Sequence, residues 1–143
     1  MRHPEFIIFT GPMFGSKTTR LMAVVDRFKY QNRKVLAFKP MMDDRYNQAD
    51  IVTHNGGKIT ASTVQDAAEI FMHLAESDDN YDVVAVDEAF MIDDIANTCL
   101  NFFYDKRIDV LVSTLDLSSS LSSFEEVSTL LGHATKKIGR AHV

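Results

Sequence analysis

The stretch FIIFTGPMFGSKTT, residues 6–19, joins a short apolar run to a glycine-containing loop and a lysine. It nearly matches the pattern G-x-x-x-x-G-K-[ST], in which backbone N–H groups and the lysine bind the phosphates of a nucleotide. One position departs from that pattern, because Ser16 precedes the lysine and the second glycine comes one residue earlier, as Gly15. The stretch therefore predicts a strand, a phosphate-binding loop and a helix in succession. The plainer interpretation is a glycine-rich turn with an ordinary surface lysine.

The rest of the chain alternates apolar runs of strand length with helical patterns. The predicted strands are residues 6–10, 35–38, 83–86 and 110–113, each nearly continuous in apolar residues, as strands buried on both faces are. The first predicted helix places Leu21, Val24, Val25 and Phe28 on one face, and the others span residues 63–76, 92–103 and 124–131. Residues 51–60, with Asn-Gly-Gly at the centre, predict a β-hairpin. This alternation indicates a single α/β domain over residues 1–143 with a mostly parallel sheet, from which the hairpin would be an excursion.

A second motif, DVVAVDE at residues 82–88, ends an apolar strand in two adjacent carboxylates. In folds with a phosphate-binding loop, a carboxylate at such a strand end meets the Mg²⁺ that the loop's threonine holds, here Asp87 and Thr18. Glu88 would point the other way along the pleat or turn off the strand end, and so be free to act on an acceptor. The alternative is a solvated strand terminus.

Composition limits the class of protein. The 143 residues are 45% hydrophobic and 24% charged, which is typical of a globular domain. A net charge of -5 argues against non-specific binding to nucleic acid. No apolar run approaches the roughly 20 residues of a membrane span. Cys99 is the only cysteine, so these residues contain neither an internal disulfide nor a cysteine-built zinc site. A cytoplasmic protein fits these features.

Several motifs, in the right order and spacing, resemble the thymidine kinases of the cellular and bacterial type, which many large DNA phages also carry. GPMFGSKTT differs from that family's GPMFSGKT or GPMFSGKS loop in the order of two residues, and KPMMDDRY at residues 39–46 matches K-x-x-x-D-x-R-Y. Weaker matches are Thr53-His54, the strand end VDEAFM at residues 86–91 where the family has I-D-E-x-Q-F, and Leu115-Asp116 followed by Phe124. The resemblance covers nearly the whole chain and implies a P-loop NTPase-like α/β fold.

The resemblance also implies roles for individual residues. Glu88 would be the catalytic base that takes the proton of the 5′-hydroxyl, and Thr18 and Asp87 would hold Mg²⁺. The positions implied at the ATP phosphates are Gly11, Pro12, Met13, Phe14, Gly15, Ser16, Lys17, Thr18, Asp43 and Arg45. The positions implied at the nucleoside are Met13, Met91, Leu115 and Phe124. For Met13, Leu115 and Phe124, packing in the core is the alternative interpretation.

Three departures from the family pattern bear on activity. Ser16 stands where glycine allows the loop to turn, and an unsuitable φ at a non-glycine residue costs on the order of 1–3 kcal/mol; Gly15 would relieve part of this strain. Phe90 and Met91 replace Gln-Phe beside the base. The family's zinc site, built from cysteine pairs, and its lasso-shaped lid over the thymine have no counterpart in these residues, which contain no Cys-x-x-Cys pair. We therefore expect no zinc.

Two functions are consistent with these features. The first is an ATP- and Mg²⁺-dependent kinase that converts thymidine, or deoxyuridine, to the 5′-monophosphate. By resemblance it would be a homo-oligomer, a tetramer in the family. Composition and charge predict a cytoplasmic protein with no nucleic-acid or membrane partner. The second is a kinase-like protein that has lost catalysis and acts by binding a nucleotide or docking on a partner protein. An unrelated P-loop ATPase or GTPase does not account for GPMF and D-x-R-Y.

Overall fold

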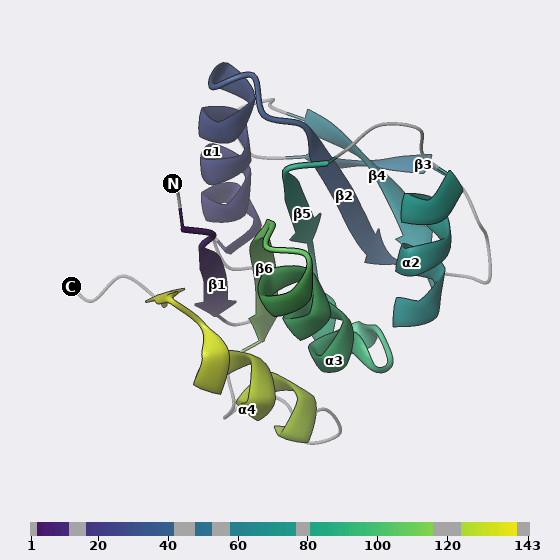
Figure 1. Cartoon of the computed structure of the whole chain (residues 1–143), viewed down its shortest axis with the longest axis vertical. Helices are drawn as coiled ribbons and strands as arrows, with labels where there is room; N and C mark the ends of the chain where they lie inside the picture. Colours follow the sequence, from purple (N-terminus) through teal and green to yellow (C-terminus); the bar gives the residue numbers. More distant parts are fainter. Residues whose placement is uncertain are drawn as a thin grey trace.

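Figure 1 shows the computed structural model of the chain, which describes residues 3–11, 17–41, 48–52, 58–76, 81–115 and 124–139. The strands are β1 (Phe6–Gly11), β2 (Val35–Pro40), β3 (Gln48–Val52), β4 (Lys58–Val64), β5 (Val83–Val86), β6 (Asp109–Leu115) and β7 (Lys136–Ile138). The helices are α1 (Lys17–Tyr30), α2 (Ala67–Glu76), α3 (Ile95–Leu100) and α4 (Phe124–His133), with a 3-10 turn η1 (Ala89–Met91) and a π-helical segment η2 (Asn101–Asp105).

In the described part of the chain, the strands form one seven-stranded sheet in the order β3-β4-β2-β5-β6-β1-β7. Every neighbouring pair is parallel except β3 with β4. The predicted α/β fold with a mostly parallel sheet is therefore confirmed. The predicted hairpin is present as β3 and β4, but it does not leave the sheet. Its second strand pairs with β2 and extends the sheet at one edge.

The apolar side chains of the central strands fill two cores, one on each face of the sheet. Helix α1 covers one face, and α2, α3 and α4 cover the other (Figure 1). Along β6 the faces alternate, as successive residues of a strand must: Leu111 belongs to the core that contains Leu21 of α1, whereas Val110 and Val112 belong to the core that contains Leu130 of α4. Strands buried on both faces explain why the sequence showed continuous apolar runs.

A buried ion pair joins the end of α1 to the start of β6. Asn32 takes the left-handed conformation, with φ of 59°, that often ends a helix. The next residue, Arg33, forms a salt bridge with Asp109, which is fully buried. The guanidinium of Arg33 also lies over the ring of Phe28, 4.5 Å from its centroid. These contacts hold the end of the sheet at which β6 begins, which is opposite the carboxyl ends of β1, β5 and β6.

The second helix begins later in the structure than the sequence predicts. Residues 63 and 64 belong to β4, and Val64 is a buried strand residue that lies opposite Pro40 of β2. The helix starts at Ala67, after Asp66, whose Oδ1 accepts a hydrogen bond of 3.2 Å from the backbone N–H of Glu69. Such side-chain capping satisfies an N–H group that has no partner within the helix.

The third predicted helix, residues 92–103, is divided in the structure. Asp94 adopts the left-handed conformation, with φ of 62°, and α3 begins only after it. The backbone N–H of Ala96 in the first turn of α3 donates to Glu126 Oε2 of α4 at 2.7 Å. From Asn101 the chain continues as η2. The fourth predicted helix is confirmed as α4, and the three-residue strand β7 was not predicted.

Candidate active site

The register of the parallel strands determines which residues meet at one edge of the sheet. Gly11, the last residue of β1, lies opposite Leu115, the last residue of β6, and Val86 at the end of β5 lies opposite Val112. Ligand sites of parallel sheets form outside the carboxyl ends of the strands, where the following helices begin. In this structure the end of β1, the start of α1 and the two residues that follow β5 lie together at the carboxyl ends of the strands.

Lys17 is the first residue of α1, and its side chain is only 2% exposed. Its Nζ lies 2.9 Å from Oε1 of Glu88, whose side chain is 25% exposed. A lysine is almost never fully buried unless it is paired, and this ion pair provides a partner. The structure therefore rules out the ordinary surface lysine. It sets a cation at a helix N-terminus, where the helix dipole already favours a phosphate.

Asp87 follows β5 directly, and the residue is buried. Its Oδ1 accepts a hydrogen bond of 3.0 Å from Oγ1 of Thr18 and another from Oγ of Ser113. Its backbone N–H donates to the carbonyl oxygen of Phe38 at 2.9 Å. The carboxylate is thus held beside the second residue of α1, and the structure brings together the two residues that the sequence predicted for Mg²⁺.

Glu88 turns off the end of β5 instead of continuing the pleat. Its φ and ψ are 51° and 45°, a left-handed conformation that non-glycine residues rarely adopt and that clusters at functional sites. Its backbone N–H donates to Ser113 Oγ at 2.9 Å, and its carboxylate contacts Lys17. The turn agrees with one of the two predicted directions. Lys17 contacts one oxygen of the Glu88 carboxylate, whose side chain is 25% exposed, and the action of Glu88 on an acceptor stays a prediction.

The donor set at Thr18 and Asp87 fits Mg²⁺. The ion prefers oxygen ligands, and at phosphate-transfer sites it takes one or two from the protein and the others from phosphates and water. A hydroxyl and a carboxylate oxygen 3.0 Å apart supply that share. Within the described ranges, no group of three or more His, Cys, Asp or Glu side chains is arranged to hold a metal ion.

The positions expected to line the nucleoside differ in burial. Met91, in η1, is 42% exposed and is therefore not a core residue. Leu115 is buried at the end of β6, opposite Gly11, the last residue of β1. Phe124 begins α4, but its side chain lies outside what the structure describes. The other expected site positions lie outside the described residues: Pro12, Met13, Phe14, Gly15, Ser16, Asp43 and Arg45.

The sequence reasoning missed Ser113, whose hydroxyl contacts both residues of the Asp87-Glu88 pair. It assigned Ser113 only to the end of a predicted strand. A signal was present, because a serine followed by a threonine interrupts an otherwise apolar buried strand. Polar groups that are buried have hydrogen-bond partners in most cases.

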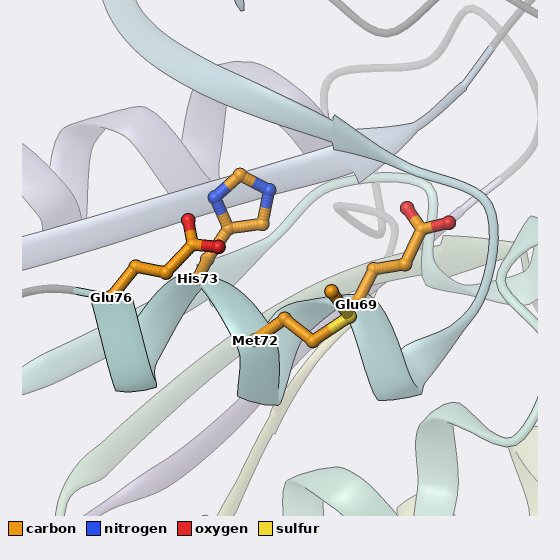
Figure 2. Close-up of a pocket in the computed structure, with 4 residues that line it drawn as sticks. All are labelled: Glu69, Met72, His73 and Glu76. Atoms are coloured by element: carbon orange, nitrogen blue, oxygen red, sulfur yellow. The ribbon is translucent and has the colours of Figure 1, made fainter.

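A surface hollow lies elsewhere, along α2. Figure 2 shows the side chains that line it, Glu69, Met72, His73 and Glu76, on successive turns of that helix. The ring of His73 packs edge-on against the ring of Phe38, with centroids 5.6 Å apart. None of the expected site residues lines this hollow. Among the described residues, no helix combines the length and apolar character needed to cross a membrane.

The sequence was also compared with models of protein families. The model described as thymidine kinase matches residues 5–139. That range contains Lys17, Thr18, Asp87, Glu88 and Ser113, the residues that the structure brings into contact. It also spans the sheet from β1 to β7.

Proposed function

Because the chain belongs to the thymidine kinase family, we propose that it transfers the γ-phosphoryl group of Mg²⁺-ATP to the 5′-hydroxyl of thymidine. Membership of the family indicates a nucleotide-binding kinase that acts on a nucleoside. Thymidine, or deoxyuridine, is the acceptor that the sequence motifs favour. The observation that carries the proposal is the contact of Lys17 with Glu88 and of Thr18 with Asp87 at one edge of the sheet.

The phosphate side of the site would be formed by the start of α1. Lys17 can offset negative charge on the β- and γ-phosphates, and the N-terminus of α1 contributes the positive end of its dipole. Thr18 and Asp87 would hold Mg²⁺, which supplies further neutralisation of phosphate charge when bound. Since Asp87 is already fixed by two hydroxyl groups, it needs little rearrangement to take this role.

On the acceptor side, Glu88 would act as the general base. As the 5′-oxygen of thymidine forms its bond to the γ-phosphorus, the bond from that phosphorus to the β–γ bridging oxygen breaks and ADP leaves. The proton of the 5′-hydroxyl passes to the carboxylate of Glu88 and then to solvent. A carboxylate suits this task because phosphoryl transfer depends mainly on positioning and charge stabilisation, with little covalent chemistry for the protein.

The ion pair between Lys17 and Glu88 connects the two sides. Each group has a different partner during transfer, the phosphates for Lys17 and the hydroxyl for Glu88. Binding of the nucleotide would draw the ammonium group away from the carboxylate and leave Glu88 able to accept a hydrogen bond from the nucleoside. We infer that nucleotide binding prepares the acceptor site.

Release of ADP in the presence of Mg²⁺-ATP tests this function, with thymidine, deoxyuridine and deoxycytidine as acceptors. The wild-type chain should release ADP only with an acceptor, fastest with thymidine. Glu88→Gln should lower kcat by about 10²- to 10⁴-fold, the usual contribution of a general base. Glu125→Gln, at an exposed glutamate in the first turn of α4, is the matched control and should leave kcat unchanged.

Two outcomes would contradict the proposal. Equal rates for wild type and Glu88→Gln would remove Glu88 from the reaction. Binding of Mg²⁺-ATP without turnover of any acceptor would favour the alternative, a kinase-like protein that acts by binding a nucleotide. The features of the sequence that support this alternative are the exchange that leaves Ser16 before the lysine, Phe90 in place of the family's glutamine, and the missing counterpart of the family's lid.

A further inference from the structure

One buried hydroxyl group, on Ser113, contacts both acidic residues of the site. Ser113 is fully buried near the end of β6. Its Oγ donates a hydrogen bond to Asp87 Oδ1 and accepts one of 2.9 Å from the backbone N–H of Glu88. A serine hydroxyl has one hydrogen to donate and two lone pairs that accept, so both bonds can form at once. Replacement by alanine would remove both together.

The position of Ser113 follows from the register of the sheet. Val86, the last residue of β5, lies opposite Val112 of β6, so the residues that follow them in the chain, Asp87 and Ser113, are neighbours. Ser113 shares a strand face with Leu111, which packs in the core formed with α1. The hydroxyl therefore points toward the side of the sheet on which Thr18 also reaches Asp87.

The bond from Glu88 to Ser113 also secures a strained turn. Glu88 is in the left-handed region, and η1 follows it immediately, with the N–H of Met91 donating to the carbonyl oxygen of Glu88 at 3.1 Å. The N–H of Glu88 ties this turn back to β6. The direction of the Glu88 side chain depends on the same φ and ψ. Loss of the tie would therefore allow the carboxylate to leave its place beside Lys17.

We propose that Ser113 is a positioning residue that fixes the carboxylate of Asp87 and the backbone of Glu88 through a single hydroxyl. The expected effect of replacing Ser113 on turnover rests on the proposed kinase function. The expected effect on Mg²⁺-dependent binding of ATP does not need that function. Ser113 is not expected to touch a reacting atom, and it acts through the two acidic residues that do the chemistry.

The test compares Ser113→Ala with Ser113→Thr, which keeps the hydroxyl, and with Thr98→Val. Thr98 is a buried threonine of α3 whose hydroxyl bonds to the carbonyl oxygen of Asp94, so its replacement controls for the loss of a buried hydroxyl. Isothermal titration with ATP over a range of Mg²⁺ concentrations gives a readout independent of turnover. Steady-state kinetics with thymidine and thermal unfolding complete the measurement.

We expect Ser113→Ala to raise the Mg²⁺ concentration needed for half-maximal ATP binding by about tenfold or more. Loss of a side chain that hydrogen-bonds to a metal ligand typically has an effect of this size. The value of kcat should fall by about 10- to 100-fold, while the KM for thymidine changes by less than about threefold. Ser113→Thr, which keeps the hydroxyl, should leave the Mg²⁺ dependence of ATP binding and kcat close to their wild-type values. Thr98→Val should lower the melting temperature without moving the Mg²⁺ dependence.

The proposal is overturned if Ser113→Ala lowers only the melting temperature and leaves the Mg²⁺ dependence and kcat as in the wild type. If the alanine variant does not fold, Ser113→Cys provides the same readouts, because a thiol of similar size is only a weak donor and acceptor. If the wild type binds ATP but does not phosphorylate thymidine, the proposed function fails. The Mg²⁺ dependence of ATP binding then still decides the role of Ser113.

Discussion

Removing the charge of Glu88 should tighten nucleotide binding, even though it should slow transfer. In the structure, Nζ of Lys17 lies 2.9 Å from Oε1 of Glu88, and the lysine side chain is 2% exposed. A hydrogen bond between charged groups contributes about 1.5–3 kcal/mol, and a neutral partner contributes roughly half of that. Glu88→Gln therefore weakens the contact that competes with the phosphates by about 0.8–1.5 kcal/mol. This corresponds to an ATP affinity about four- to twelvefold higher.

Isothermal titration of the wild type and Glu88→Gln with Mg²⁺-ATP measures this effect directly. No nucleoside is present, so no transfer disturbs the titration. Glu125→Gln removes the same charge from an exposed position on α4 and should bind ATP as the wild type does. Equal or weaker binding by Glu88→Gln would refute the reasoning, because it would mean that the ion pair with Lys17 does not oppose nucleotide binding.

Three further predictions concern stability, reactivity and the loop. Asp109→Asn should lower the free energy of unfolding in urea by about 3–5 kcal/mol, since it leaves the charge of Arg33 in a largely buried place; a loss below about 1 kcal/mol would contradict this. Burial raises the pKa of Cys99 from 9.0 to about 12, so native protein at pH 8 should resist thiol reagents that label the urea-unfolded chain, and stability should fall as the pH rises from 9 toward 12. The double exchange Gly15→Ser and Ser16→Gly, which restores the order of the family's loop, should tighten ATP binding by about tenfold or more in isothermal titration. Unchanged affinity would show that the loop is not strained.

The sequence predicted the elements whose patterns are unambiguous. The four strands with continuous apolar runs were confirmed, as were α1 and α4. The errors arose where a pattern continued past a boundary. Val64 has the spacing of a helical residue relative to Ala67 and Ala68, but pairing with β2 keeps it in a strand, and the cap at Asp66 sets the start of α2. The strand β7 is short and begins with two lysines, so its pairing with β1 had no apolar signal.

The candidate site was predictable in its residue types and less so in its contacts. Lys17, Thr18, Asp87 and Glu88 stand in recognisable motifs, and the order of strands brings them to one edge of the sheet. The bridge made by Ser113 depends on the register between β5 and β6, which no local pattern reveals. The ion pair of Lys17 with Glu88 likewise depends on the left-handed turn at Glu88, a conformation that the residue's identity does not favour.

Transfer of labelled phosphate from [γ-³²P]ATP to thymidine tests the central claim most directly. The reaction contains Mg²⁺ and the wild-type chain, and the product is separated and compared with authentic thymidine 5′-monophosphate. The proposed function predicts labelled 5′-monophosphate from the wild type and from Glu125→Gln, and almost none from Glu88→Gln. Absence of labelled nucleotide from a wild-type chain that binds Mg²⁺-ATP would contradict it and would identify a protein that binds the nucleotide without transferring its phosphate.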